Sequence, residues 1–263
     1  MNFIIFFLTL FSVTPKPQYQ FNLKVQQFGE ALMNGESRGI YRLFVTSFRQ
    51  EIDYSRFDSA FKAWQAGRRI MRLQNKAIDT RGLGGHASTY VFFQGASDYE
   101  YLYHNWIYTD SGWELAWISQ ILDQSFQYGM KDTTELRIIV KRSLEFFISP
   151  EGLKHIKLGK IKLDTIAVVK TGYINDSFEV LAGRQVVWRA KEDIIQDKFL
   201  TRMPVFCEFG LVKNFGDVAL VTIDLKPSPY YFGRKIIKRP RGMEVYLKKD
   251  KGNWQVHSVG KRW

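Results

Sequence analysis

The sequence contains only one cysteine, Cys207, in 263 residues. A single thiol excludes an intramolecular disulfide and any metal site that needs two cysteines. Histidine is also scarce: the four residues, at positions 86, 104, 155 and 257, form no His-x-His or His-Glu-x-x-His pattern. We therefore expect no metal and no other cofactor. The apolar setting of Cys207 in the segment Val205–Phe209 indicates a buried, inert thiol.

Long hydrophobic runs are missing as well. The longest, Phe3–Val13, would span about 16 Å as a helix, roughly half of a bilayer core, so no transmembrane segment is expected. Its length is typical of a signal-peptide hydrophobic region, although no Lys or Arg precedes it. We expect residues 1–20 to be a signal peptide and linker, and the protein to be exported, either to the periplasm or as a secreted protein. A disulfide-free exported chain fits a bacterial envelope. The alternative for the apolar run is a buried N-terminal strand.

Acidic residues are outnumbered by basic residues in the second half of the chain, but not in residues 21–128. Residues 21–128 hold 11 Lys and Arg against 11 Asp and Glu, whereas residues 129–263 hold 26 against 15. Lys16 supplies the rest of the net charge of +12. This asymmetry favours two units with different surfaces, a neutral one over 21–128 and a basic one over 129–263.

The first unit has helical periodicity followed by strand patterns. Apolar residues recur at helical spacing in 25–32, 40–48 and 57–64. Ser55, with Asp58 three residues later, is close to a capping box for the third segment. After Gly67, four segments rich in β-branched and aromatic residues alternate with turn signals. One of these signals, RGLGGHAS, lies between two predicted strands, so it predicts a hairpin turn rather than a phosphate-binding loop. Three helices followed by four strands predict an α+β fold in which helices cover an antiparallel sheet.

Two pieces of the first unit carry a family resemblance: FGEALMNGESRGIYRLF as a helix pair and DSGWELAWI as the closing hairpin. With them, residues 22–120 resemble the nuclear transport factor-like, or cystatin-like cone, superfamily, which includes ketosteroid isomerase and polyketide cyclase-type members. The resemblance implies three helices on a curved antiparallel sheet that together enclose a pocket. Isomerase-type catalysis would need a carboxylate on a pocket strand and an oxyanion donor. No matching set can be aligned in this chain.

The second unit is expected to be a strand-rich α+β domain. An apolar stripe over 136–148 predicts a helix that ends at Pro150. Strands are predicted within 160–174, 204–213, 217–226, 243–250 and 254–261, whereas 184–200 fits either a helix or a strand. The turn at 251–254 is similar to the turn at 110–113, which leaves a diverged second cone as an alternative to a different α+β fold.

The segment Tyr101–Ile118 contains six Tyr and Trp residues. Strand alternation places Leu102, His104 and Trp106 on one face and Tyr101 and Tyr103 on the other. We favour core packing on one face, with an aromatic outer face against the second unit. The alternative is the pocket of the resembled family, whose candidate residues are Trp64, Tyr101, Tyr103, His104, Trp106 and Trp117. A catalytic version of that alternative uses His104, Asp98, Tyr101 and Tyr103.

The most basic stretch is Gly233–Gly252. Its candidates for binding an anion are Arg234, Lys235, Lys238, Arg239, Arg241, Lys248 and Lys249. They would suit an anionic envelope surface, or they form a solvated hairpin whose charges prevent edge-to-edge pairing. Export argues against nucleic acid as the partner.

Together these patterns favour an exported, non-catalytic binding or interaction protein. Its expected partner is an anionic envelope surface or another protein. The competing hypothesis is a cone-pocket isomerase, cyclase or hydrolase that acts on a small hydrophobic substrate.

Overall fold

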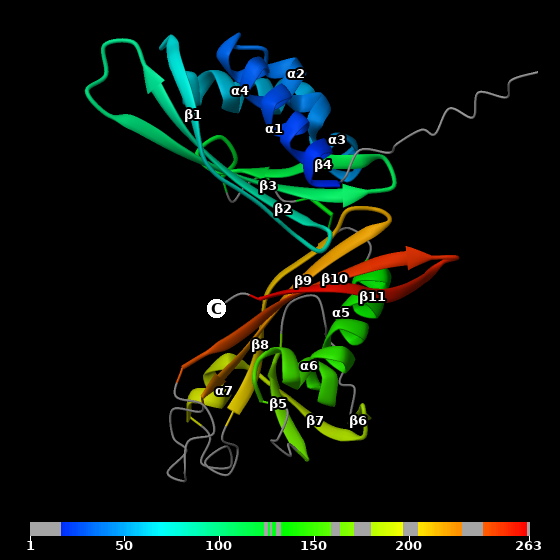
Figure 1. The fold of residues 1–263 in the computed structure, drawn as a ribbon. Helices are drawn as coiled ribbons and strands as arrows, with labels where there is room; N and C mark the ends of the chain where they lie inside the picture. Colours follow the sequence, from blue (N-terminus) through cyan, green and yellow to red (C-terminus); the bar gives the residue numbers. More distant parts are fainter. Residues whose placement is uncertain are drawn as a thin grey trace, which may run out of the picture.

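The computed structural model describes residues 17–123, 126, 128–129, 133–158, 164–170, 180–196, 205–227 and 239–261, and they form helices and two β-sheets (Figure 1). The expected α+β class is confirmed. The apolar run Phe3–Val13 lies outside the described residues. The first helix begins at Pro17, inside the expected linker, because proline is well suited to the first turn of a helix. Among the described residues, no helix combines the length and apolar character that a membrane crossing requires.

The first unit consists of four helices followed by a four-stranded antiparallel sheet in the order β1-β2-β3-β4. Its elements are α1 (Pro17–Met33), α2 (Ser37–Leu43), α3 (Thr46–Glu51), α4 (Tyr54–Gln65), β1 (Ile70–Arg81), β2 (Gly84–Phe93), β3 (Tyr99–Thr109) and β4 (Gly112–Ile118). The RGLGGHAS motif forms the turn between β1 and β2, as expected.

The second expected helix is split into α2 and α3 at Phe44 and Val45. The backbone of these two residues is extended because it pairs with the sheet: Phe44 bridges Leu115, and the Val45 amide donates to the Leu115 carbonyl at 2.9 Å. A long-range contact therefore overrides the local helical period.

The predicted cap of α4 is displaced by two residues. Asp53, and not Ser55, is the N-cap, and its carboxylate accepts a hydrogen bond from the Arg56 amide at 2.9 Å. The Ser55 hydroxyl donates to that same carboxylate. Asp58, the proposed partner in the capping box, instead pairs with Lys62 at 2.6 Å.

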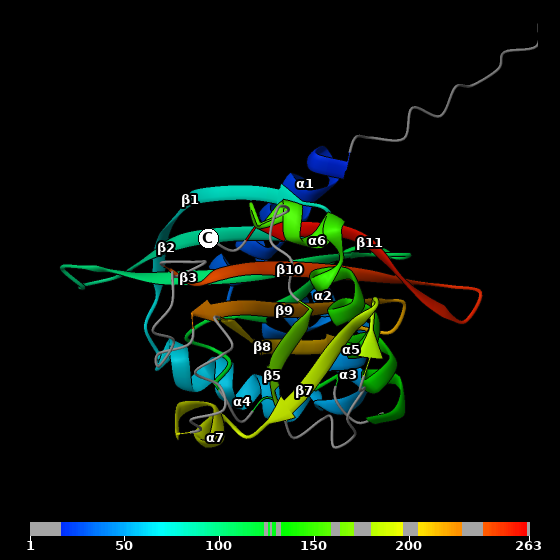
Figure 2. The same cartoon turned by 90° about the horizontal axis from the view of Figure 1, so that it is seen from below.

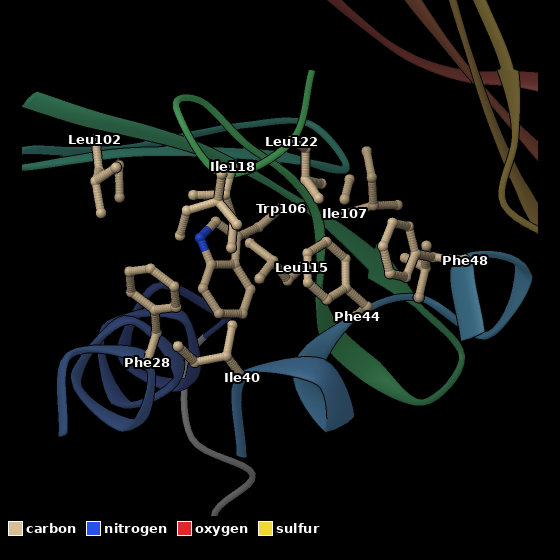
Figure 3. Packing of buried hydrophobic residues seen from close by; sticks show 14 of the residues in the cluster. Phe28, Ile40, Phe44, Phe48, Leu102, Trp106, Ile107, Leu115, Ile118 and Leu122 are labelled. Carbon is tan, nitrogen blue, oxygen red and sulfur yellow. The ribbon is translucent and has the colours of Figure 1, made fainter. Parts of the chain in front are cut away.

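The helices bury the inner face of the first sheet. Figure 3 shows Trp106 among Phe28, Ile40, Leu115 and Ile118, with Phe44 and Phe48 beside them. Trp106 is 1% exposed and Phe28 is 0% exposed, so large rings fill the space between the helices and the sheet. Burying rings of this size supplies much of the hydrophobic free energy of such a core.

The second unit is a curled, mixed sheet of seven strands with three described helices. Its elements are α5 (Thr133–Ile148), α6 (Pro150–His155), β5 (Thr165–Val169), β6 (Val180–Leu181), β7 (Arg184–Arg189), α7 (Lys191–Gln196), β8 (Val205–Asn214), β9 (Val218–Pro227), β10 (Arg241–Asp250) and β11 (Asn253–Lys261). The ambiguous segment 184–200 contains both a strand, β7, and a helix, α7.

The strand order of this sheet is β11-β10-β9-β8-β5-β7-β6, and β5 runs parallel to both β7 and β8. Figure 2 shows β8 to β11 side by side in this order. The two faces are covered differently. Ile166 and Val168 of β5 belong to the large core beneath α5, whereas Ala167 and Val169 pack with Ile194 of α7.

The two units meet at the β1–β2 and β3–β4 turns (Figure 1). Tyr246 of β10 is fully buried in the hydrophobic cluster of the first unit. Its hydroxyl lies 2.1 Å from the position that a Cβ atom on Gly84 would occupy, so only glycine leaves room for this ring. The Lys248 ammonium pairs with Asp110 at 2.8 Å, and the Asp110 amide donates to Asp217 at 2.8 Å.

Candidate functional site

The most unusual surface of the first unit is the outer face of β3. Its side chains alternate as expected: Leu102 and His104 are fully buried, whereas Tyr99, Tyr101 and Tyr103 are 49%, 45% and 37% exposed. The expected cover from the second unit reaches only one end of this face. Tyr99 and Tyr101 lie near the β2–β3 turn, at the end of the strand that is remote from the second unit (Figure 1).

Two rings of β2 extend this aromatic surface. Register pairs Tyr90 with Tyr101 and Phe92 with Tyr99. The ring centroid of Tyr90 lies 4.2 Å from that of Tyr99 and 5.6 Å from that of Tyr101, and Phe92 lies 5.8 Å from Tyr99. We call Tyr90, Phe92, Tyr99, Tyr101 and Tyr103 the tyrosine face.

Two cations of β1 border the tyrosine face. The Arg72 guanidinium lies 4.1 Å from the centroid of Phe92, and the Lys76 ammonium lies 5.8 Å from that of Tyr90. Neither pairs with a carboxylate of the described residues. The surface therefore combines aromatic rings with positive charge that the described part of the chain does not neutralise.

The tyrosine face ends at a polar cluster where the two units meet. The Tyr103 hydroxyl lies 2.8 Å from Nδ1 of His86, which is also 2.8 Å from Oδ1 of Asn105. On the other side, Nε2 of His86 lies 3.9 Å from Glu244, whose carboxylate accepts a hydrogen bond from Tyr246 at 2.9 Å. Burial, followed by the charge of Glu244, raises the pKa of Tyr103. This junction holds one end of β3 against the second unit.

The four residues of the predicted catalytic set do not come together. His104 faces the core, Tyr101 and Tyr103 face outward, and Asp98 is exposed in the β2–β3 turn. Nδ1 of His104 accepts a hydrogen bond from Nε1 of Trp106 at 2.9 Å, and its Nε2 lies 3.1 Å from the Thr89 hydroxyl. Burial lowers the pKa of His104 to about 3, so the ring is neutral near pH 7.

The six predicted pocket residues also divide between the two faces of the sheet. Trp106 and His104 fill the core, while Trp64 lies on α4 and donates from Nε1 to Glu100 at 2.9 Å. Trp117, Tyr101 and Tyr103 belong to the outer side. Packed rings therefore occupy the place where the family resemblance implied a pocket.

The basic segment is only partly described. Arg234, Lys235 and Lys238 lie outside the described residues, and Arg239 is exposed. Arg241 begins β10. Lys248 pairs with Asp110 across the junction, and Lys249 pairs with Glu135, which also accepts a hydrogen bond from Trp254. The ammonium groups of these two lysines therefore form ion pairs with carboxylates of the protein itself.

Three cations near these rings were not among the residues predicted from the sequence: Arg72, Lys76 and Lys213. The first two could have been found from the alternation of β1, which places Arg72 on the same face as the tyrosines. Lys213 of β8 has no comparable signal, because its neighbours are distant in sequence. Its ammonium lies 3.8 Å from the ring centroid of Tyr128 and 5.4 Å from that of Trp117. Burial lowers the pKa of Lys213 to about 8, and the charge of Glu51 partly opposes this shift.

No family model matches this sequence, and no curated protein matches it. One solved structure, described as "Ntf2 like protein involved in plasmid conjugation", is similar with a TM-score of 0.23 and 9% sequence identity over 87% of each chain. The chain thus has a weak structural similarity to a nuclear transport factor-like protein.

Proposed function

We propose that this chain is a non-catalytic binding protein that holds a partner protein on its tyrosine face. The observation that carries the proposal is the exposure of Tyr99, Tyr101 and Tyr103 on a sheet whose opposite face is already filled. Contiguous exposed apolar surface is typical of interaction sites. Tyrosine and arginine are also among the residue types enriched at the positions that dominate binding energy in protein interfaces.

Binding has more support than catalysis. A general acid or base has to reach its substrate, whereas His104 is fully buried and bonded to Trp106 and Thr89. Asp98 is exposed in the β2–β3 turn. The packed interior supports a structural role for the first unit, with the outer face of its sheet available for recognition.

The charge of the surface indicates the chemistry of the partner. Arg72 and Lys76 border the rings without a carboxylate from the described residues, so an acidic protein surface would complement them. An anionic envelope surface at Gly233–Gly252 has weaker support, because Lys248 and Lys249 already pair with Asp110 and Glu135.

A photo-cross-linking amino acid at position 101 tests the proposal in cells that make the full chain. The same group at Leu23, which is 41% exposed on α1, is the control. We expect a discrete adduct with a different protein from position 101 only, and less of it when Arg72→Glu is added. Adducts from both positions, adducts only between copies of this chain, or no adduct would each contradict the proposal.

The proposal includes export, which rests on the apolar run Phe3–Val13. N-terminal sequencing of the protein recovered from outside the cytoplasm checks it. A new N-terminus between that run and the first residues of α1 is the expected result, and recovery of the protein in the cytoplasm with Met1 intact would contradict export.

A further inference from the structure

The closest ring contact on the tyrosine face joins two tyrosines from neighbouring strands. The ring centroids of Tyr90 on β2 and Tyr99 on β3 lie 4.2 Å apart, and the two ring planes are inclined by 32°. Register pairs Tyr90 with Tyr101, so Tyr99 is the diagonal neighbour of Tyr90. Aromatic side chains can bridge such a diagonal in an antiparallel sheet. The two rings therefore lie closer to parallel than to edge-on.

The hydroxyl groups of this pair also meet. Tyr99 forms a hydrogen bond with the Tyr90 side chain, and this bond is the largest cause of the raised pKa of Tyr99. Because the hydroxyls are together and the ring planes are nearly parallel, the ring carbons ortho to the two hydroxyls are neighbours. Two oxidised tyrosines couple through these ortho carbons.

Both rings can be reached from solvent. Tyr99 is 49% exposed, and Tyr90 is half-buried. They lie beside the β2–β3 turn, at the end of the sheet that is remote from the second unit (Figure 1). An oxidant can therefore approach the pair without any rearrangement of the two units.

No other pair of tyrosines in the described part of the chain combines a short distance, aligned rings and exposure. The rings of Tyr41 and Tyr54 lie 5.4 Å apart and meet edge-on, at 68°. Tyr101 is exposed, but its ring lies 5.6 Å from that of Tyr90 and is inclined by 56°. The geometry thus favours coupling of Tyr90 with Tyr99.

We propose that Tyr90 and Tyr99 are an oxidation site that forms a dityrosine cross-link when the protein meets a peroxide and a peroxidase. The peroxide takes up the hydrogen atoms of the two phenol O–H bonds and is reduced to water. The two phenoxyl radicals then form one carbon–carbon bond between their ortho positions. Each ring recovers its aromaticity as its ortho hydrogen moves to the oxygen.

This bond ties β2 to β3 covalently beside their turn. It closes the loop between positions 90 and 99, which lowers the conformational entropy of the unfolded chain as a disulfide does. The single cysteine of the chain, Cys207, is buried and cannot supply an internal disulfide. The cross-link also fixes two rings of the tyrosine face in one arrangement. The inference needs only the exposed pair and does not depend on a partner protein.

Treatment of the purified full chain with a plant peroxidase and hydrogen peroxide, at low protein concentration, tests the inference. A protease that cleaves before Asp98 separates the two tyrosines in the unmodified protein. We expect dityrosine fluorescence, a chain lighter by two hydrogen atoms, and a digest in which the peptides that carry Tyr90 and Tyr99 stay joined. Cross-links at other tyrosines instead of this pair, covalent dimers in place of the internal bond, or no dityrosine would overturn the inference.

Two substitutions on the same strand provide the matched control. Tyr99→Phe should lose most of the dityrosine, because phenylalanine has no phenol hydrogen atom to give up. Tyr101→Phe makes the same change at a side chain of similar exposure, 45%, and should leave the yield of joined peptides unchanged. Near-ultraviolet circular dichroism checks that both variants are folded. Equal losses in the two variants, or an unchanged yield in Tyr99→Phe, would contradict the assignment to this pair.

Discussion

At the scale of single residues, His104 is fully buried and Lys213 is partly buried, and desolvation disfavours the charged form of both side chains. Burial lowers the pKa of His104 to about 3 and that of Lys213 to about 8. His104 is neutral near pH 7 and forms hydrogen bonds with its neighbours. Lys213 keeps its charge near pH 7, and contacts of its ammonium with the Tyr128 and Trp117 rings offset part of the cost of desolvation. Their effects on stability therefore appear in different pH ranges.

His104 should make the fold sensitive to acid. The unfolded state takes up a proton below the usual pKa of 6.5, whereas the folded state resists protonation until about pH 3. The free energy of unfolding should thus fall by up to about 1.4 kcal/mol for each unit by which the pH is lowered from 6.5 to about 3. Urea unfolding of the parent protein and of His104→Gln at pH 4 to 7 isolates this contribution. The variant should be less stable at pH 7 but should lose less on acidification; parallel pH profiles would contradict the assignment.

Lys213 should weaken the fold near neutral pH. Between pH 8 and 10.5 the unfolded state holds the proton that the folded state has released, so stability should rise with pH in this range. Lys213→Met removes the partly buried charge and keeps an apolar contact with the rings. We expect the variant to be more stable at pH 7, by about 1 to 3 kcal/mol, with the gain shrinking toward pH 10. A loss of stability at pH 7 would show that the cation–ring contacts outweigh the cost of burial.

At the scale of elements, local patterns predicted most helices and strands and the alternation of β3. What they missed depends on distant partners. Phe44 and Val45 leave the helix because their backbone joins Leu115, and the cap moves to Asp53, two residues before Ser55. Alternation could separate Tyr101 from Leu102, but it could not show how little of the outer face the second unit covers.

Substitutions on the two faces of β3 should have very different costs. Leu102 is fully buried, so Leu102→Ala should destabilise the protein by about 2–5 kcal/mol through lost burial and a cavity. Tyr101 is 45% exposed, so Tyr101→Ser should cost less than about 1 kcal/mol. Chemical unfolding at one pH compares them directly. A large cost at Tyr101 would mean that the tyrosine face stabilises the fold and is not reserved for a partner.

At the scale of the whole molecule, the two units share a core. Phe215, Val218 and Tyr246 come from the second unit but pack in the hydrophobic cluster of the first. The charge asymmetry of the sequence predicted a division into two units, but nothing in the local sequence indicates that Gly84 accommodates Tyr246, since that contact joins residues far apart in the chain.

Gly84→Ala should therefore weaken the connection between the units. The new Cβ atom would overlap the Tyr246 hydroxyl, and displacing this buried ring should cost about 1–3 kcal/mol. Gly29→Ala is the matched control. Gly29 lies in α1, and a Cβ atom there would lie 3.8 Å from the Leu73 side chain, an ordinary van der Waals distance. Differential scanning calorimetry should show a lower melting temperature for Gly84→Ala and an unchanged or higher one for Gly29→Ala. Equal behaviour of the two variants would argue against a close-packed junction.

The most direct test of the tyrosine face as a binding surface is hydroxyl-radical footprinting of its side chains. In the purified protein, Tyr99 and Tyr101 should be oxidised readily and the buried Trp106 should not. In intact cells that make the full chain, oxidation of Tyr99 and Tyr101 should fall several-fold, while Met33, which is 40% exposed on α1, should react as before. Equal oxidation of the two tyrosines in cells and in the purified protein would contradict the proposal that a partner covers them.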